Sequence, residues 1–213
     1  MTNWYQQFSP NVSSEFKEIL LNPEELIRQG EIVKNDKSTT VVSFDFENQS
    51  YILKRFNARS KGHAVKRALR RTRAKNCWQM SSIFSESGIN VAEPIALLEA
   101  RHGLIKANSY FICIKLEGVE LLDWLPKQQD EIQSNVANQV QKIFSIFKQK
   151  KLSHGDMKAS NLMWSEEYQA VFMIDLDAAK YHRNPLFFNR AYRRDKRRFS
   201  RNGKVFEQIV AAI

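Results

Sequence analysis

The sequence predicts an α+β protein of two lobes, in which a five-stranded antiparallel sheet with one long helix precedes a minimal, mostly helical lobe. Three observations predict this fold. Five short runs rich in β-branched and aromatic residues lie in the first half, a long basic segment with helical periodicity interrupts them, and amphipathic helical patterns dominate the second half. We expect the first lobe to span residues 1–116 and the second residues 117–213.

The chain is expected to open with two short helices. Ser13 or Ser14 is a suitable N-cap for the first helix, and "NPEELIRQ" places Pro23 at the favourable first position of the second. Three strands follow, joined by the short turns "DKS" and "ENQ", with the sequences "GEIVKN", "TTVVSFDF" and "SYILKRF".

A long basic helix is expected next, from about His63 to Ser85. Its inward face is marked by residues at spacings of three and four, namely Val65, Leu69, Thr72, Asn76, Met80 and Ile83. The run "SGIN" ends this helix, and "PIALLEA" and "SYFICIKL" complete the five strands.

The second lobe is expected to begin near Leu116 to Gly118, with "LEGVELLDWL". The segment from Asp130 to Lys150 is typical of an amphipathic helix, with Ile132, Val136, Val140, Ile143 and Phe147 on one side. The 36 residues after Asp177 are typical of one or two basic helices.

The composition is that of a soluble globular protein, with 213 residues, 43% hydrophobic and 26% charged. No apolar run reaches the roughly 18 residues that span a bilayer. The start, "MTNWYQQFSPNV", lacks a basic region followed by an apolar stretch, so no secretory signal is expected. Cys77 and Cys113 lie in apolar runs and are expected to be reduced core thiols of a cytoplasmic protein.

The net charge of +10 is unevenly distributed. Ten Lys and Arg residues and no acid lie between Lys54 and Lys75, and ten more with the single acid Asp195 lie between Lys180 and Lys204. The rest of the chain carries 13 bases against 22 acids. Such concentrated charge indicates an anionic partner, either a membrane surface, a phosphorylated substrate or nucleic acid, or else a solvated basic face.

Charged and polar residues crowd the segment "SHGDMKASNLMW", just before an apolar strand. Asp156 lies two residues before Lys158 and five before Asn161. A short hairpin after Asn161 would return Asp175, in "VFMIDLDAAK", to the same end. Amide and carboxylate oxygens brought together suit Mg²⁺, which keeps other positions for water and phosphate.

These residue types meet the needs of phosphoryl transfer. Asp156 can accept a proton from, or orient, an attacking hydroxyl, and Lys158 can place positive charge on a phosphoryl group in transit. His154 is expected to be a hydrogen-bonding scaffold rather than an acid or base.

The same motifs carry a resemblance to known families. "HGDMKASN" resembles the protein-kinase catalytic loop His-Arg-Asp-x-Lys-x-x-Asn, "IDLD" resembles its Asp-Phe-Gly motif, and "YILK" resembles the Val-Ala-Ile-Lys strand. Together with "SYFICIKLEG", "HAVKRALRRTRA" and "RAYRRDKRRFSRN", they make roughly residues 30–203 similar to the bacterial lipopolysaccharide kinase family, the Kdo and heptose kinases of the inner core.

The resemblance implies a bilobal protein-kinase-like fold and an enzyme that uses ATP and Mg²⁺. It implies catalytic roles for Asp156 and Lys158 and metal ligation by Asn161 and Asp175. It further implies nucleotide contacts from Lys54, Lys34, Ile114 and Leu116.

The chain departs from the kinase pattern at four places. Gly155 replaces the arginine that anchors a phosphorylated activation segment, so activation-loop control is not expected. "KNDKSTT" replaces the glycine-rich loop, and Lys34 and Lys37 there either touch phosphates or form a solvated turn. The long helix offers Lys54 no glutamate partner, which keeps a weakly active or pseudokinase alternative open, and Asp177 replaces the usual glycine, either as a metal contact or as a turn cap.

The leading hypothesis is an ATP-dependent kinase of a sugar hydroxyl in the lipopolysaccharide inner core, peripheral on the inner face of the cytoplasmic membrane. The acceptor would be a lipid-anchored or free sugar, and the alternatives are a minimal serine/threonine protein kinase or a silent nucleotide-binding or membrane-binding module. Nucleic acid is not expected, because no aromatic residue interleaves the basic run from Lys54 to Lys75 except Phe56 at its start. Two arginine clusters are expected to serve the membrane rather than the chemistry: Arg67, Arg70, Arg71 and Arg73, and Arg193, Arg194, Arg197 and Arg198.

Overall fold

The computed structural model of the chain describes residues 3–57, 71–102 and 105–213. Contacts divide it into two compact units, unit 1 with Met1–Gln79 and Glu93–Lys115, and unit 2 with Met80–Ala92 and Leu116–Ile213. Residues 80–92 thus belong with the C-terminal unit, whereas one boundary in the sequence, at residue 116, would place them in the first lobe.

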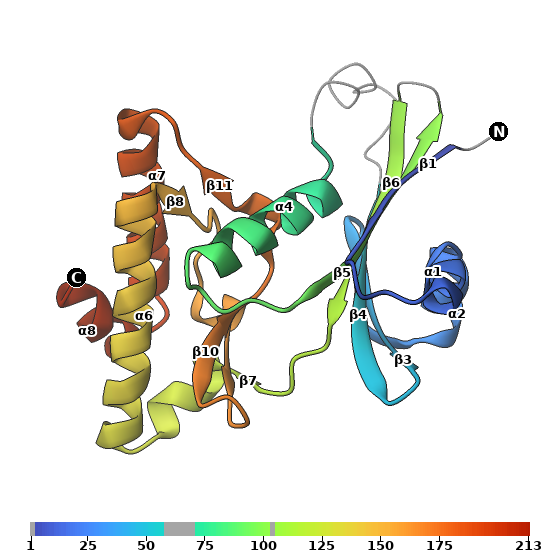
Figure 1. The fold of residues 1–213 in the computed structure, drawn as a ribbon. Coiled ribbons are helices and arrows are strands. Elements are labelled where there is room, and N and C mark those ends of the chain that lie inside the picture. Colours follow the sequence, from blue (N-terminus) through green and yellow to red (C-terminus); the bar gives the residue numbers. More distant parts are fainter. Residues whose placement is uncertain (1–2, 58–70, 103–104) are drawn as a thin grey trace. The chain divides into compact units, whose positions relative to one another are not determined.

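Figure 1 shows the elements, which are β1 (Asn3–Phe8), α1 (Ser14–Leu20), α2 (Pro23–Gln29), β2 (Glu31–Asn35), β3 (Thr39–Phe46), β4 (Gln49–Phe56), α4 (Arg73–Glu86), β5 (Pro94–His102), β6 (Ile105–Ile114), β7 (Val119–Glu120), α5 (Leu121–Trp124), η2 (Leu125–Lys127), α6 (Asp130–Lys150), β8 (Leu152–Ser153), η3 (Ala159–Asn161), β9 (Leu162–Ser165), β10 (Ala170–Met173), η4 (Leu176–Ala178), β11 (Lys180–Tyr181), α7 (Pro185–Ser200) and α8 (Lys204–Ala211).

Unit 1 is built on an antiparallel sheet of six strands in the order β1-β5-β6-β4-β3-β2. All five predicted strands are present, but the predicted strand number is wrong because β1 adds a sixth. This strand pairs along β5 from Asn3, opposite Arg101, to Phe8, opposite Ala96. Most residues of β1 are exposed. Its sequence therefore lacks the alternation of apolar and polar residues that marks a half-buried strand.

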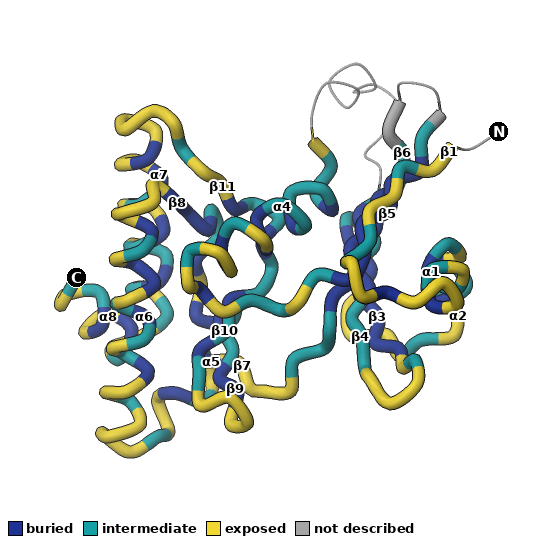
Figure 2. The backbone as a smooth tube through the Cα atoms, in the orientation of Figure 1, coloured by how far each residue is buried: buried dark blue, intermediate teal, exposed yellow. Residues whose placement is uncertain are grey.

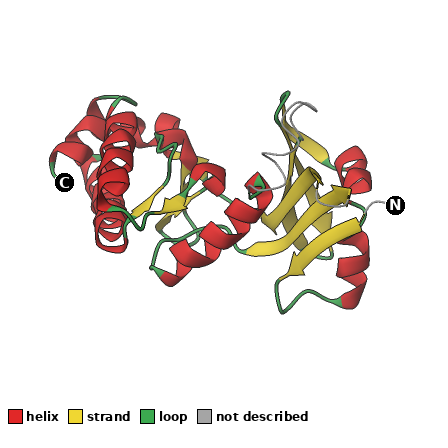
Figure 3. Ribbon diagram, turned by 90° about the horizontal axis from the view of Figure 1, so that it is seen from above, coloured by secondary structure: helices red, strands yellow, loops and turns green. Residues whose placement is uncertain are grey.

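Helices α1 and α2 cover one face of this sheet (Figure 3). The Oγ of Ser13 accepts a hydrogen bond from the backbone N–H of Phe16 at 3.1 Å, and α2 begins at Pro23, so both predicted helix starts are confirmed. Phe16 stacks on Phe46 with ring centroids 4.2 Å apart and lies 4.8 Å from Tyr51. This aromatic cluster joins α1 to the sheet.

Helix α4 begins at Arg73, ten residues after the predicted start at His63. The Oγ1 of Thr72 accepts from the backbone N–H of Lys75 at 3.1 Å and donates to the buried carboxylate of Glu99 at 2.5 Å. Thr72 therefore caps the helix, and residues 71 and 72 are not helical. The earlier part of the predicted helix, with Val65 and Leu69, lies outside the described residues.

Met80 is buried on the inward face of α4, as predicted, but the rest of this face is displaced by about one residue from the prediction. Its buried residues are Ala74, Cys77, Met80, Ser81 and Phe84, whereas Asn76 and Ile83 are half-buried. Cys77 and Cys113 are both buried and form no disulfide, as predicted. Burial raises the pKa of the Cys113 thiol to about 11, an effect that the nearby positive charge of Lys54 opposes.

Unit 2 packs a three-stranded sheet, β10-β9-β7, and a β8–β11 pair with helices α6, α7 and α8. Helix α6 has the predicted bounds, and Val136, Val140, Ile143, Phe144 and Phe147 form its buried face (Figure 2). The prediction for Ile132 is wrong, because this residue of the first turn is exposed. The predicted C-terminal helices are present as α7 and α8, but only α7 is basic, since α8 carries one lysine and one glutamate.

Phe144 is the centre of the unit 2 core. Its ring makes edge contacts with Phe147, Tyr192 and Phe199 at centroid distances of 6.1, 6.0 and 5.9 Å. These contacts fix α7 against α6. None of the helices in the described ranges is long and apolar enough to cross a membrane.

Replacing Phe16 tests the packing of α1 on the sheet. Phe16→Ala should lower the free energy of unfolding by about 3–5 kcal/mol, because it removes a buried ring from an aromatic cluster that cannot collapse fully around the space. Urea denaturation gives this value. Ile32→Ala, at an exposed position of the same sheet, should change stability by only about 0.5 kcal/mol, and equal effects of the two substitutions would contradict the packing.

Candidate active site

The segment from Ser153 to Asn161, here called the catalytic loop, follows α6 directly. The helix ends at Lys150, and the left-handed conformation of the next residue, Lys151, reverses the chain into β8. Gly155 also has a positive φ of 82°, and a Cβ at this position would overlap the carbonyl oxygen of Ala178. Glycine is therefore required here by backbone conformation and by the close approach of η4.

A buried carboxylate on α7 holds this loop. The Oδ2 of Asp195 accepts from the backbone N–H of His154 at 2.8 Å and of Gly155 at 3.0 Å. Asp195 is fully buried, and its Oδ1 has no hydrogen-bond partner among the described residues. Sequence reasoning missed this role, although Asp195 fits the inward spacing of Phe188, Ala191 and Phe199.

His154 is a scaffold residue, as predicted. Its ring is buried, Nδ1 accepts from the backbone N–H of Asp156 at 3.3 Å, and Nε2 donates to the carbonyl oxygen of Ile174 at 2.9 Å. Both ring nitrogens are therefore engaged with backbone, and the ring joins the catalytic loop to the segment that carries Asp175.

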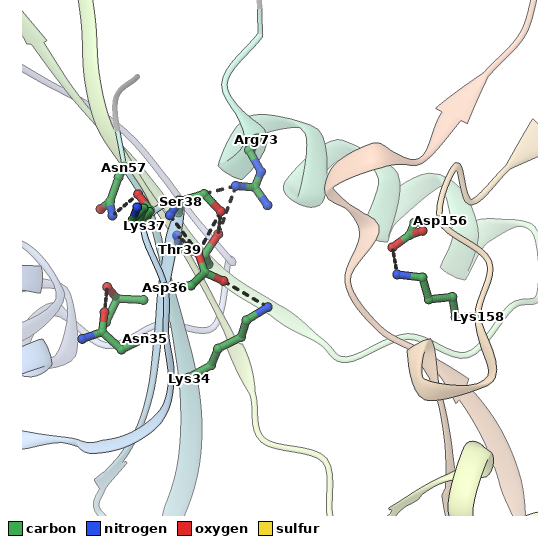
Figure 4. Close-up of polar contacts among 11 residues, drawn as sticks. Lys34, Asn35, Asp36, Lys37, Ser38, Thr39, Asn57, Arg73, Asp156 and Lys158 are labelled. Atoms are coloured by element: carbon green, nitrogen blue, oxygen red, sulfur yellow. Dashed lines mark hydrogen bonds and ion pairs between the residues drawn. The ribbon is translucent and has the colours of Figure 1, made fainter. Parts of the chain in front are cut away.

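Two cations flank the carboxylate of Asp156. Lys158 Nζ donates to Oδ2 at 2.9 Å (Figure 4), and Arg198 Nη1 donates to Oδ1 at 2.8 Å. Arg198 also donates to the carbonyl oxygen of Gly155 at 2.6 Å. The Asp156 side chain remains 33% exposed, so a hydroxyl group from solution can reach it.

Arg198 therefore corrects the prediction for the C-terminal arginine cluster. This residue faces the catalytic loop, whereas Arg193, Arg194 and Arg197 are exposed. Of the other cluster, Arg73 donates to the carbonyl oxygen of Ser38 and to Thr39, so it also has a structural contact. Arg71 is exposed, and Arg67 and Arg70 lie outside the described residues.

Asn161 and Asp175 lie beside each other at one end of the β9–β10 hairpin, as predicted. The hairpin pairs Leu162 with Met173, and the backbone N–H of Ile174 donates to the carbonyl oxygen of Asn161 at 3.0 Å. The Nδ2 of Asn161 donates to the carbonyl oxygen of Asp156 at 2.7 Å, which fixes the orientation of the amide. Asp175 follows in a left-handed conformation with φ of 61°.

The donor chemistry of this pair fits Mg²⁺. One amide oxygen and one carboxylate are hard ligands, and Mg²⁺ in nucleotide sites commonly takes only one or two protein ligands and completes its shell with water and phosphate. No cluster of three or more His, Cys, Asp or Glu side chains suited to a metal occurs in the described ranges. Asp177, in η4, is half-buried, and its two predicted roles stay open.

The predicted nucleotide contacts belong mainly to unit 1. Lys54 pairs with Val41 and Phe111 in the adjacent strands, so its side chain lies on the same face of the sheet as theirs. Ile114 instead packs against the cluster beneath α1 and α2, on the other face. A nucleotide could therefore use only the backbone of Ile114. Leu116 is half-buried at the start of the unit 2 segment.

The β2–β3 turn that replaces a glycine-rich loop is organised by Asp36 (Figure 4). Its Oδ1 accepts from the backbone N–H groups of Ser38 and Thr39 at 2.7 and 2.9 Å, and its Oδ2 lies 3.2 Å from Lys34 Nζ. The bonds from Ser38, then the contact with Lys34, hold the pKa of Asp36 well below its usual range. The ammonium of Lys34 thus forms an ion pair within the turn itself.

Comparisons with known proteins agree with these motifs. The model of the lipopolysaccharide kinase (Kdo/WaaP) family matches residues 24–208. A solved structure of WaaP in complex with acyl carrier protein is similar to this fold, with a TM-score of 0.65 and 14% identity over 98% of this chain and 89% of that one. At this identity the structural similarity supports the fold alone. No curated protein matches the chain.

Replacing Asp195 tests its hold on the catalytic loop. Asp195→Ala should lower the free energy of unfolding by about 2–4 kcal/mol, because the buried N–H of His154 and the half-buried N–H of Gly155 lose their acceptor. Asp195→Asn should cost less, since one oxygen is retained. Chemical denaturation measures both, and the exposed acid variant Asp123→Ala in the same unit is the control. Equal stability of Asp195→Ala and Asp123→Ala would contradict the anchoring role.

Proposed function

Because the chain belongs to the lipopolysaccharide kinase (Kdo/WaaP) family, whose members are phosphotransferases, we propose that it transfers the γ-phosphate of ATP to a sugar hydroxyl of the lipopolysaccharide inner core. The observation that carries this proposal is the position of Asp156, beside Lys158 and hydrogen-bonded through its backbone to Asn161. These are the residue types that a phosphoryl-transfer site requires.

Asp156 is the proposed acceptor of the proton from the attacking hydroxyl. The hydroxyl oxygen bonds to the γ-phosphorus, the bond from that phosphorus to the bridging oxygen of ADP breaks, and the proton passes to the carboxylate. Each carboxylate oxygen of Asp156 can accept a second hydrogen bond, so the hydroxyl can approach beside the two cation contacts. Lys158 is the more exposed of the two cations, and its ammonium is available to the phosphoryl oxygens.

Asn161 and Asp175 are the residues that would hold Mg²⁺. When bound, the ion would neutralise negative charge on the phosphate groups. The hydrogen bond to the carbonyl oxygen of Asp156 uses the amide nitrogen of Asn161 and not its amide oxygen, the atom that would bind the ion. Lys54 is the proposed unit 1 ligand of the nucleotide phosphates. Lys34 is a weaker candidate, because Asp36 already neutralises it.

The acceptor is proposed to be Kdo or heptose, lipid-anchored or free, at the inner face of the cytoplasmic membrane. The exposed arginines of α7 support an anionic membrane surface as a partner. The similar WaaP structure contains acyl carrier protein, which supports a protein of that kind as a second partner.

An acceptor assay tests the proposed reaction. With radiolabelled ATP, label should enter core glycolipid and not a generic protein substrate, and Asp156→Ala should reduce the rate at least about 100-fold because the proton acceptor is lost. Nucleotide affinity should be retained in this variant. Label in protein would indicate a minimal protein kinase, and no label with any acceptor would indicate a silent nucleotide-binding module.

Calorimetry of nucleotide binding tests the metal ligands. Asp175→Ala should weaken the binding of ATP in the presence of Mg²⁺ by at least about tenfold, because an anionic ligand shared by metal and phosphate is lost. Asn161→Ala should have a smaller effect, since it removes a neutral oxygen. Without Mg²⁺ the three proteins should bind ATP alike. Unchanged affinity of Asp175→Ala with Mg²⁺ would place the metal elsewhere.

A further inference from the structure

Three large apolar side chains are exposed where β11 leads into α7. Leu186 and Phe187 expose 77% and 68% of their surface, and Tyr181 exposes 56%. All residues from Arg183 to Phe187 are exposed, and Figure 2 shows this segment running along the surface of unit 2. We call Tyr181, Leu186 and Phe187 the apolar edge.

The fold accounts for the backbone of this segment but not for its side chains. The Oδ1 of Asn184 accepts from the backbone N–H of Leu186 at 2.8 Å, and Pro185 opens the helix, so the first turn is well defined. Phe188, the next residue, is buried 5.5 Å from the ring of Tyr192. The core therefore accepts one of three consecutive apolar residues and leaves two in solvent, which is unusual for a surface without a partner.

Positive charge surrounds the apolar edge. Arg190 lies four residues after Leu186 and three after Phe187, so it shares their side of the helix. The exposed bases of the same segment are Lys180, Arg183, Arg190, Arg193, Arg194 and Arg197. Its one acid, Asp195, is buried and bonded to backbone N–H groups, so it does not offset this charge at the surface.

We propose that the apolar edge inserts into the interfacial region of a bilayer that contains anionic lipid, with the arginines of α7 at the level of the headgroups. Apolar tips flanked by long basic side chains match this environment, because the tips leave water while the guanidinium groups stay at the phosphates. An acidic protein surface would complement the same positive charge, and the measurements below distinguish it from a membrane. The proposal rests on the proposed function in one respect, since a lipid-embedded acceptor requires access to the membrane.

Vesicle sedimentation with the full chain tests the insertion. The wild type should bind vesicles of phosphatidylcholine with phosphatidylglycerol and not vesicles of phosphatidylcholine alone. The double variant Leu186→Ser, Phe187→Ser should bind the anionic vesicles at least about tenfold more weakly, because both inserting side chains are lost. Tyr168→Ser is the matched control, since Tyr168 is 60% exposed in the same unit but follows two glutamates, and it should bind as the wild type does.

Salt separates insertion from charge attraction. Added salt should remove the difference between the wild type and the double variant Arg190→Gln, Arg194→Gln, because exposed charges are screened beyond about 8 Å at physiological ionic strength. In added salt, the Leu186→Ser, Phe187→Ser variant should still bind anionic vesicles more weakly than the wild type does, although both proteins then bind less tightly. If the Leu186→Ser, Phe187→Ser variant bound anionic vesicles as tightly as the wild type does, the proposal would be overturned. If this variant lost only the ability to bind acyl carrier protein, the apolar edge would be a protein-binding surface instead.

A second measurement does not depend on removing the apolar side chains. Phe187→Cys can be labelled with an environment-sensitive dye, since Cys77 and Cys113 are buried. Its emission should shift to the blue on anionic vesicles, and a dye on Tyr168→Cys should not. An unshifted emission at residue 187 would overturn the proposal. Neither measurement uses ATP or an acceptor, so their failure is distinct from absence of phosphate transfer in the acceptor assay.

Discussion

The carboxylate of Asp195 holds the backbone of His154 and Gly155, and the rest of the site is built on that contact. Asp156 follows these two residues directly, and its backbone carbonyl orients Asn161. The position of Asp195 depends in turn on the packing of α7 through Phe199, which contacts Phe144 of α6. The helical core thus determines where the carboxylate of Asp156 lies.

Local sequence patterns predicted the elements whose stability is local or periodic. The bounds of α6 were predicted because acids open the helix, lysines close it, and its apolar residues repeat at helical spacing. The neighbouring positions of Asn161 and Asp175 followed from hairpin geometry. Strand β1 was missed because an exposed edge strand depends on backbone pairing with β5, which its residue types do not record.

The roles of Asp195 and Arg198 could not be predicted because they depend on contacts between distant parts of the chain. Arg198 reaches a carboxylate 42 residues earlier, and its neighbours in sequence are mostly exposed bases. Composition alone therefore placed Arg198 in one cluster with Arg193, Arg194 and Arg197, all expected to serve a membrane surface. Helical spacing places these charges on two sides of α7. Asp195 and Arg198 lie on the side that packs against the rest of unit 2, whereas Arg193, Arg194 and Arg197 face solvent.

The β2–β3 turn has a consequence for the entropy of ligand binding. A glycine-rich loop samples many conformations and must lose that freedom when it closes over phosphates. Here Asp36 already holds Ser38 and Thr39, and Arg73 holds the same two residues from α4. A ligand would therefore find this turn preordered and would lose little conformational freedom there. The carboxylate of Asp36 already accepts the hydrogen bonds of the Ser38 and Thr39 N–H groups, so these groups cannot also bind a phosphate. The turn is therefore well ordered but has a lower affinity for phosphate.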